Sequence, residues 1–224
     1  MRLDLAAKEL TLKLVYYGPA LSGKTSNLRA IHRLASSEAC GQLMTLAMKN
    51  ERTLFFDMLP IAIAVGDGFR VRLKLFSVPG QLMHEATRRL VLQAADGIAF
   101  IADSRRSEAS TNRESFLRLH RNLRHNGVDP ARMPMVVQFN KRDLEDIRSD
   151  EELETIGARS HEPIYKAVAT RGHGVMQTLH GLIRKTWLKL ETDQHLEDRV
   201  GINASRSMRA IESMLGNRPE WQAP

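Results

Sequence analysis

Apolar and polar positions along the chain follow two patterns that alternate from segment to segment. Residues 10–17 are apolar at every second position, at Leu10, Leu12 and Leu14, which is typical of a strand. The order of such segments up to residue 190 predicts an α/β fold, with a mostly parallel sheet covered by helices on both faces. The expected strands are 10–17, 61–65, 70–76, 97–102, 133–139 and 163–168, and the expected helices are 24–34, 82–94, 108–125, 150–156 and 175–190.

One edge of this sheet is expected to be antiparallel. The sequence Gly66-Asp67-Gly68 lies between two apolar runs, and an Asp-Gly pair in that position is a hairpin signal. We therefore predict a six-stranded sheet with one antiparallel edge strand. Residues 36–60, which precede the hairpin, are expected to be irregular.

The composition changes towards the C-terminal end. We expect residues 1–192 to form one domain, long enough to bury a full core. Residues 193–224 are expected to form a partly helical C-terminal extension. Its segment 205–215 places Arg206 and Arg209 among apolar residues, so this helix would dock on the domain, on a partner or on an anionic membrane. Docking on the domain is the interpretation that we favour.

The bulk composition indicates a soluble globular protein. Hydrophobic residues make up 42% and charged residues 26% of the 224 positions. The net charge of +7 suits an acidic partner, but aromatic residues are only 5%, and no direct nucleic-acid role is expected. The single cysteine, Cys40, excludes an intramolecular disulfide and fits a reducing compartment. Without a membrane-length apolar stretch or a signal peptide, the protein is expected in the cytoplasm.

Residues 18–25 read GPALSGKT and fit the phosphate-loop pattern G-x-x-x-x-G-K-T between a strand and a helix. Gly18 and Gly23 let the chain wrap tightly enough for several backbone N–H groups to point at one anion. Lys24 would reach the terminal phosphates, and the Thr25 hydroxyl would ligate a magnesium ion. The following helix presents its positive dipole end to the same phosphates. Nucleotide binding is therefore the working hypothesis.

A second motif, Asn140-Lys141-Arg142-Asp143, follows the buried strand 133–139. The Asp143 carboxylate can accept two hydrogen bonds from the N1–H and the exocyclic amine of guanine, a pair that adenine does not offer. Lys141 can lay its aliphatic stem along the purine face, and Asn140 can tie this loop to the phosphate loop. Because an unmatched base would leave buried polar groups unpaired, such contacts discriminate sharply. The motif favours guanine.

A third motif, Pro79-Gly80-Gln81, lies between the other two. The Gly80 N–H can approach a γ-phosphate, and Gln81 can orient a water molecule for in-line attack. On its own this sequence would indicate an ordinary turn. Together with the other two motifs it favours nucleotide hydrolysis.

The sequences GPALSGKT, RT (residues 52–53), SVPGQ and NKRD, in this order, resemble a Ras-like small GTPase. The phrases YYGPALSGKTSNL, ERTLFFDMLP and SVPGQ are more closely similar to the bacterial MglA-type GTPases, which act in cell polarity and gliding motility. The resemblance covers about residues 10 to 190, and ERTLFFDMLP is its most family-specific part. It implies the small G domain of the P-loop NTPases.

The resemblance implies roles for individual residues. Thr53 matches the switch threonine that reaches magnesium and the γ-phosphate, and Arg52 matches a built-in arginine finger. Gln81 matches the water-positioning glutamine, and the Ala169 N–H matches the group that reads the guanine oxygen. The catalytic residues are thus expected to be Gln81, Arg52 and Lys24, and the metal ligands Thr25 and Thr53. The expected nucleotide-binding set is Gly18, Ala20, Leu21, Ser22, Gly23, Lys24, Thr25, Ser26, Thr53, Gly80, Asn140, Lys141, Asp143 and Ala169.

Cofactors and partners also follow from the resemblance. GTP or GDP and Mg²⁺ would be bound, intrinsic hydrolysis would be slow, and a roadblock-fold MglB-like protein would act as activator. Motility or polarity effectors would bind the GTP state, with the protein concentrated at a cell pole. A P-loop enzyme that phosphorylates a metabolite is a further alternative, but no second arginine cluster for a substrate phosphate supports it.

Two positions depart from the generic pattern. Ser77 stands where most small GTPases have an aspartate, as in the MglA type itself, which suggests a metal site with fewer charges. Ala20 stands where the family usually has glycine, and its methyl group would obstruct Gln81 or the arginine finger. Two functions therefore stay open: a GTP-hydrolysing switch, and a GTP-binding scaffold with little hydrolysis.

Overall fold

The computed structural model describes residues 1–49, 53–66, 68–78, 85–197, 201 and 203–215. Within these ranges the chain forms one eight-stranded sheet with the strand order β3-β4-β5-β2-β6-β7-β8, and β1 pairs with β2 beside this path. The strands are β1 (Arg2–Asp4), β2 (Glu9–Tyr17), β3 (Met44–Lys49), β4 (Thr53–Gly66), β5 (Phe69–Ser77), β6 (Gly97–Asp103), β7 (Met135–Asn140) and β8 (Ile164–Lys166).

The direction of the strands divides the sheet into two parts. The five strands β5, β2, β6, β7 and β8 are parallel to one another, so their carboxyl ends meet at one edge. Strand β4 is antiparallel to β5, which confirms the predicted hairpin. It is not the predicted edge strand, because β3 pairs with its other side, also antiparallel. The α/β fold class is confirmed, with β1 and β3 as strands beyond the six expected.

The expectation of an irregular segment over residues 36–60 is wrong. This segment contains all of β3 and the first half of β4, which pair from Met44↔Met58 to Lys49↔Thr53. At the start of β4, the apolar residues at consecutive positions 54–56 produce no alternation, and therefore no strand signal of period two. In β3 the signal is present, because Met44, Leu46 and Met48 alternate with Thr45, Ala47 and Lys49. Tertiary pairing determines the structure where the local pattern is silent.

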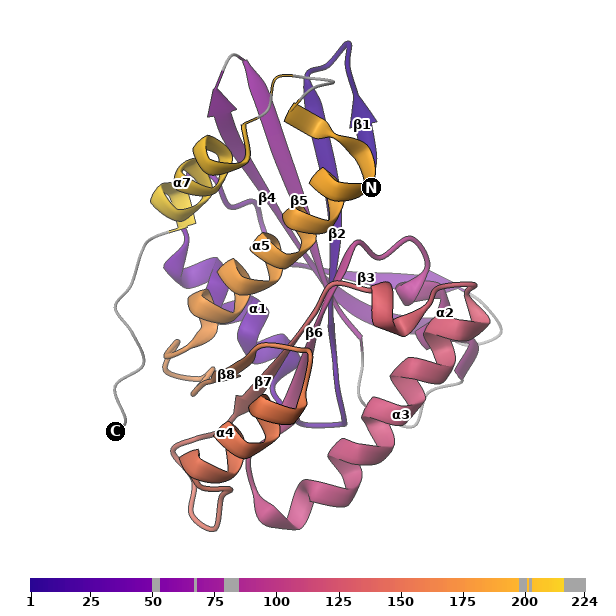
Figure 1. Cartoon of the computed structure of the whole chain (residues 1–224), viewed down its shortest axis with the longest axis vertical. Coiled ribbons are helices and arrows are strands. Elements are labelled where there is room, and N and C mark those ends of the chain that lie inside the picture. Colours follow the sequence, from indigo (N-terminus) through magenta and orange to yellow (C-terminus); the bar gives the residue numbers. More distant parts are fainter. Residues whose placement is uncertain (50–52, 67, 79–84, 198–200, 202, 216–224) are drawn as a thin grey trace.

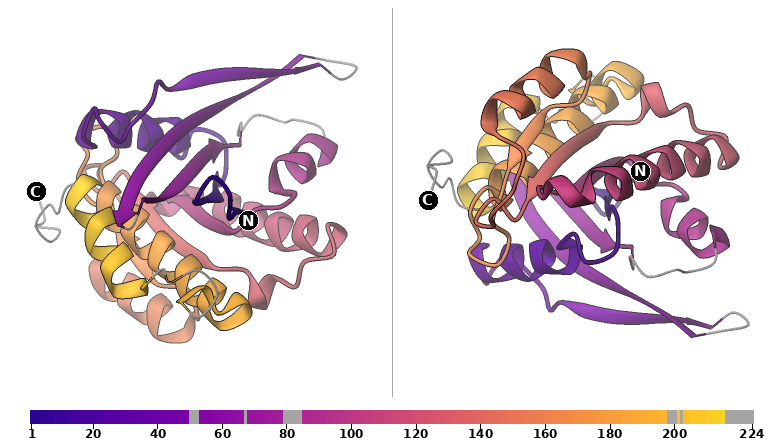
Figure 2. Two further views of the ribbon diagram at one scale, coloured as in Figure 1. Left: turned by 90° about the horizontal axis from the view of Figure 1, so that it is seen from above. Right: turned by 90° about the horizontal axis from the view of Figure 1, so that it is seen from below.

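Helices cover both faces of the sheet (Figure 1, Figure 2). Residues of α1 (Lys24–Leu34), α5 (Val175–Gln194) and α7 (Ala204–Leu215) pack in one buried cluster. Residues of α2 (Glu85–Leu92), α3 (Ala109–His125) and α4 (Asp150–Arg159) pack in a second cluster on the opposite face. Short 3-10 turns at Arg106–Glu108 and Pro130–Arg132 precede α3 and β7.

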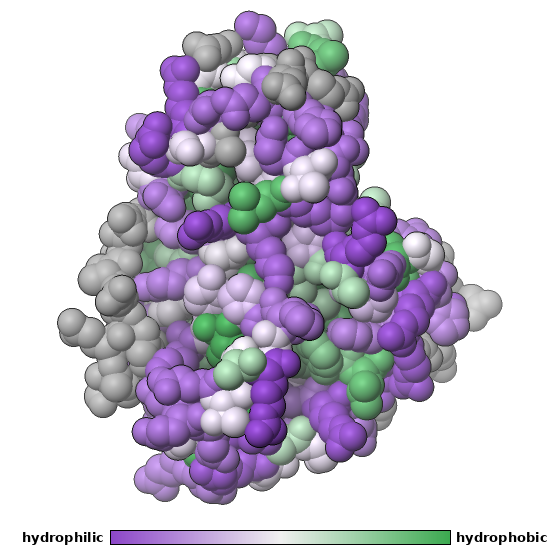
Figure 3. Space-filling model, viewed as in Figure 1, coloured by the Kyte–Doolittle hydropathy of each residue, from purple (hydrophilic) through white to green (hydrophobic). Residues whose placement is uncertain are grey.

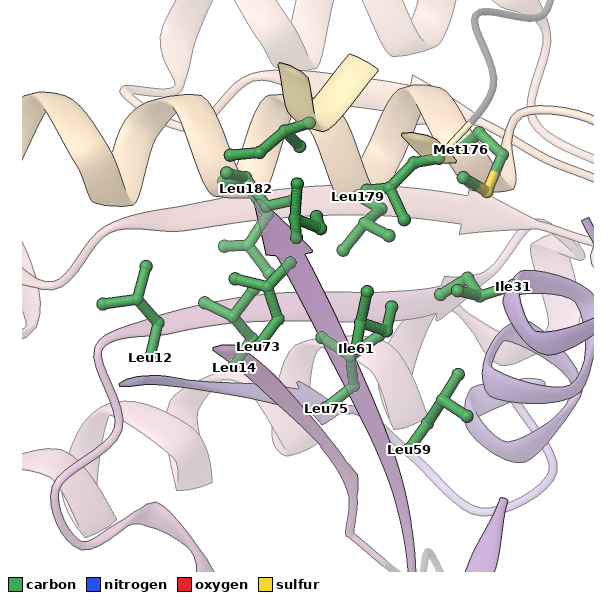
Figure 4. Packing of buried hydrophobic residues seen from close by; sticks show 14 of the residues in the cluster. Leu12, Leu14, Ile31, Leu59, Ile61, Leu73, Leu75, Met176, Leu179 and Leu182 are labelled. Carbon is green, nitrogen blue, oxygen red and sulfur yellow. The ribbon is translucent and has the colours of Figure 1, made fainter. Parts of the chain in front are cut away.

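The alternation within β2 explains why two clusters form. Leu10, Leu12 and Leu14 belong to the first cluster, whereas Val15 and Tyr17 belong to the second. Figure 4 shows Leu12 and Leu14 in the first cluster together with Leu179 and Leu182 of α5. A central parallel strand is buried on both sides, and its side chains divide between two cores.

Helix α7 packs against β4 and α5 (Figure 1). Ile211 and Leu215 are completely buried in the first cluster, and the Met214 carbonyl accepts a hydrogen bond of 3.4 Å from the Ser36 N–H. Arg209, on the opposite side of the helix, is exposed. The described part of the C-terminal extension therefore contributes to the core.

The molecular surface is predominantly polar in the view of Figure 3, with small apolar spots scattered over it. Among the described residues, no helix combines the length and the apolar character that crossing a membrane requires.

Replacing Ile211 by alanine is expected to lower the free energy of unfolding by about 2–5 kcal/mol, because it leaves a cavity between α7 and the sheet. Urea denaturation followed by circular dichroism measures this change. Arg209→Ala, on the exposed side of the same helix, is the control and is expected to change it by no more than about 0.5 kcal/mol. Equal effects of the two substitutions would show that α7 does not stabilise the domain.

Candidate functional site

The loops that follow the parallel strands meet at the carboxyl edge of the sheet, the usual place for a ligand in an open α/β sheet. The loop between β2 and α1 carries residues 18–23, and Ser77 ends β5. Asp103 ends β6, Asn140 ends β7, and Ala169 follows β8. Most of the residues predicted from the three motifs are therefore brought to one edge.

The loop 18–25 has the backbone geometry of an anion cradle. Gly18 has a φ of 151° and Gly23 a φ of 98°, both outside the range that side chains favour. A Cβ atom on Gly18 would lie 2.2 Å from the Ile101 carbonyl oxygen, and one on Gly23 would lie 2.1 Å from Asn140 Nδ2. Leu21 is also left-handed, with a φ of 59°, and its side chain is 85% exposed. The loop thus depends on glycine at its two ends.

Ala20 fits this backbone without strain. It is exposed, and it is not among the described residues that have a positive φ. The fold therefore tolerates alanine in place of glycine at this position. The alanine can affect only a group that binds against its methyl group.

Lys24 lies inside the loop with only 6% of its surface exposed. Its Nζ donates hydrogen bonds to the carbonyl oxygens of Gly18, at 3.1 Å, and Pro19, at 2.5 Å. Burial, together with the nearby positive charges of Arg88 and Lys141, lowers the pKa of Lys24 to about 8. An anion stabilises a buried ammonium group that has positive neighbours. A phosphate group bound in the loop would therefore supply the negative charge that balances Lys24.

The helix that follows supports the same chemistry. Gly23 caps α1, whose first turn contains no acidic residue. The positive end of the helix dipole is therefore not neutralised by a carboxylate of its own first turn.

A carboxylate that sequence reasoning did not select lies beside this loop. Asp57 Oδ2 accepts hydrogen bonds from Thr25 Oγ1 at 2.7 Å and from Ser77 Oγ at 3.0 Å. Its other oxygen accepts one from Thr45 Oγ1 at 3.0 Å. Asp57 reaches Ser77 because the two residues are paired across β4 and β5. A polar residue in the otherwise apolar run of residues 54–59 was the only sequence signal for it.

Asp57 changes the expected character of the metal site. Ser77 lacks the charge of the usual aspartate, but Asp57 places a carboxylate within hydrogen-bond distance of its hydroxyl. One carboxylate and two hydroxyl groups are hard oxygen donors of the kind that Mg²⁺ prefers. The residues present therefore fit a divalent cation next to the phosphate loop.

Asn140 joins three loops through its side chain. Its Nδ2 donates to the Ser22 carbonyl oxygen at 2.8 Å, and its Oδ1 accepts from the Ala169 N–H at 2.9 Å. The first bond is the link to the phosphate loop that the sequence predicts. In this structure the second bond occupies the Ala169 N–H, the group expected to read the guanine oxygen.

Lys141 and Asp143, which follow Asn140, each lie close to an oppositely charged side chain. Lys141 has a left-handed backbone, with a φ of 66°, and its Nζ donates to Asp103 Oδ2 at 2.6 Å. An Asp143 carboxylate oxygen lies 3.9 Å from Arg171 Nη2. Asp103, like Asp57, is a functional candidate that none of the three motifs contains.

Some predicted residues are not described. Arg52, Gly80 and Gln81 lie outside the described residues. The backbone of Thr53 begins β4 and pairs with Lys49, but its side chain is not described.

Replacing Gly23 by alanine is expected to lower the free energy of unfolding by at least about 3 kcal/mol, because the new Cβ adds a clash to a left-handed backbone. Asn140 cannot yield without losing its bonds to Ser22 and Ala169. The matched control is Gly127→Ala, where φ is 74° but no atom lies within 4 Å, and the expected cost is about 1 kcal/mol. Equal values in urea denaturation would contradict the crowding at Gly23.

Comparison with known proteins agrees with this geometry. No protein-family model matches the chain. Over 189 residues the chain is 39% identical to the mutual gliding-motility protein MglA of Myxococcus xanthus (strain DK1622). The match covers 84% of this chain and 97% of that relative. With the loops of a small G domain at the carboxyl edge of its sheet, the chain belongs to the MglA family of Ras-like small GTPases.

Proposed function

We propose that this chain is a GTP-binding and GTP-hydrolysing switch that controls motility or polarity by binding effectors in its GTP state. Membership of the MglA family supports a GTPase of this general kind. The observation that carries the proposal is the cradle of residues 18–25, with the buried Lys24 inside it, joined through Asn140 to the motif that would select guanine.

Guanine selection is assigned to Asp143 and Ala169. The Asp143 carboxylate would accept the N1–H and the exocyclic amine, and the Ala169 N–H would donate to the guanine oxygen. The Ala169 N–H would then have to be shared between Asn140 and the base. Lys141 would lay its stem along the purine face.

A magnesium ion would be held by Thr25 and Thr53, with Asp57 and Ser77 as its nearest anionic and hydroxyl support. When bound, the ion neutralises charge on the β- and γ-phosphates. Asp57 supports this assignment because its carboxylate already accepts hydrogen bonds from Thr25 and Ser77. The carboxylate replaces, from a neighbouring strand, the charge that Ser77 does not provide.

Hydrolysis is assigned to Arg52 and Gln81. Arg52 would stabilise charge on the transferred phosphoryl group, and Gln81 would orient the attacking water, with the Gly80 N–H on the γ-phosphate. Intrinsic turnover would be slow and would depend on a roadblock-fold, MglB-like activator. The alternative is a scaffold that binds GTP but hydrolyses little, because the Ala20 methyl group would lie where Gln81 must act.

The partners would be effectors of a motility or polarity apparatus, and the protein would lie in the cytoplasm and gather at a cell pole. The relative's name, which refers to gliding motility, supports the process but names no effector. A peripheral membrane contact through the basic C-terminal extension is part of the same proposal.

Asp57→Asn is expected to raise the Mg²⁺ concentration needed to retain nucleotide by about 10- to 100-fold, because the carboxylate that supports the ion is lost. Dissociation of a fluorescent GDP analogue during a Mg²⁺ titration measures this. The control is Asp96→Asn, whose carboxylate accepts the Lys13 N–H at the other end of the parallel strands. An unchanged Mg²⁺ requirement in Asp57→Asn would remove Asp57 from the metal site.

The proposed activity is tested by phosphate release from GTP, with and without a roadblock-fold activator. Release is expected to be slow alone and to rise with the activator, and Arg52→Ala is expected to lower the activated rate by about 1000-fold or more. Arg113→Ala, at an exposed position of α3, is the matched arginine control and should leave the rate unchanged.

The same assay separates the switch from the scaffold. Tight GTP binding without release in either condition would contradict the switch. If Ala20→Gly then restored turnover, the scaffold would be the correct function.

A further inference from the structure

Asp103 forms a buried ionic cluster beside the loop that would hold the base. Its side chain is 4% exposed, and its Oδ2 accepts from Lys141 Nζ at 2.6 Å. Arg105 binds the same carboxylate through two nitrogens, with Nε at 3.1 Å from Oδ1 and Nη2 at 2.8 Å from Oδ2. Both cations are more exposed than the carboxylate they bind, with 23% and 38% of their side chains accessible.

The charge on the Asp103 carboxylate is compensated by the two cations that bind it. Burial alone would raise the pKa of Asp103, but hydrogen bonds from Arg105 and Lys141 outweigh it and hold this pKa below its ordinary value. Asp103 is therefore ionised at neutral pH, and bonds between charged groups of this kind are short and strong. Lys141 is held by a charge with little access to water.

The backbone of Asp103 is itself held in place by helix α3. Asn112 of α3 donates through Nδ2 to the Asp103 carbonyl oxygen at 2.8 Å and accepts the Asp103 N–H at 3.0 Å. The backbone of Asp103 is also part of β6, where it pairs with Asn140. The residue that carries the carboxylate is thus fixed by a strand and a helix, and not by the loop that contains Lys141.

Lys141 needs such an anchor because its backbone is left-handed. For a residue with a Cβ atom this conformation costs about 1–2 kcal/mol, and it persists where neighbouring contacts enforce it. Asn140 is fixed by Ser22 and Ala169, and the Arg142 N–H donates to the Ala167 carbonyl oxygen at 3.1 Å. The loop backbone is thus held on both sides of Lys141, and Asp103 holds its side chain.

We propose that Asp103 is the positioning residue for Lys141, keeping the lysine stem against the purine face and so setting how long guanine nucleotide stays bound. The inference rests on the proposed guanine-binding function. It assigns to Asp103 no contact with the nucleotide and no part in hydrolysis. Asp103 acts through Lys141 alone.

A neighbouring ion pair provides the matched control. Asp150 Oδ2 accepts from Lys166 Nζ at 2.7 Å, and its Oδ1 accepts from Arg142 Nη2 at 2.7 Å. Asp150 therefore also binds two cations near the same edge, but it makes no contact with Lys141 among the described residues. Asp150→Asn removes a comparable charge without touching the proposed anchor.

The experiment measures the dissociation rate of a fluorescent GDP analogue by stopped flow at constant Mg²⁺. Asp103→Asn is expected to raise this rate by about tenfold or more, and Asp150→Asn by less than about twofold, with near-native unfolding curves as a check on folding. Lys141→Met is expected to raise the rate similarly. The double variant Asp103→Asn/Lys141→Met should then dissociate no faster than Lys141→Met, because the two residues act as one unit.

Several outcomes would overturn the inference. A rate for Asp103→Asn within twofold of the native rate would do so, as would additive effects in the double variant, which are expected of a purely structural residue. If Asp103→Asn does not fold, Asp103→Glu keeps the charge that Arg105 requires but displaces Lys141 by one methylene. It should raise the rate by about threefold or more, and an unchanged rate in this folded variant rejects the proposal.

The same measurements distinguish failure of the proposed guanine-binding function from failure of the role proposed for Asp103. A native protein that retains no guanine nucleotide would reject the proposed function itself. A native protein that binds guanine nucleotide normally, with an unaltered Asp103→Asn variant, would reject only the role of Asp103.

Discussion

The side chain of Asn140 is the constraint on which the site depends. It is 2% exposed and uses both ends of its amide, one on the phosphate loop at Ser22 and one on the loop after β8 at Ala169. An amide buried in this way cannot leave either partner without an unsatisfied polar group, which costs about 1–3 kcal/mol. It also excludes any side chain at Gly23, so the identity of one loop residue is determined by a strand far away in sequence.

The site contains two carboxylates, one near each of its ends. Asp57 lies at the phosphate end, next to Thr25, and Asp103 lies at the base end, next to Lys141. Between them Lys24 is buried near two positive charges, and its pKa is lowered to about 8. Lys24 thus has positive neighbours where a phosphate group would lie, while each carboxylate binds the groups at its own end.

The sequence predicted those parts of the molecule whose structure depends on residues close together in the chain. The hairpin and the helix after Gly23 follow from turn chemistry and spacing, and both are observed. The start of β4 was missed because its apolar residues at positions 54–56 are consecutive and have no period of two. Strand β3 was missed although Met44, Leu46 and Met48 do alternate with less apolar residues. Asp57 and Asp103 were missed for another reason, because strand register brings them to their partners. Asp57 lies opposite Ser77, and Asp103 lies opposite Asn140, the residue before Lys141. No motif contains that information.

The apolar side of α7 can either pack against the domain or insert into a membrane, but it cannot do both at once. Ile211 and Leu215 are completely buried against the sheet, in the same cluster as Ile61 and Ile63 of β4. For α7 to insert these side chains into a membrane it would have to leave the domain and expose that part of the core, at a cost of about 1.5–3 kcal/mol for each large apolar side chain. Exposed basic residues such as Arg209 stay accessible in the docked state. The packing therefore favours a helix that stabilises β4, the strand that carries Asp57 to the site.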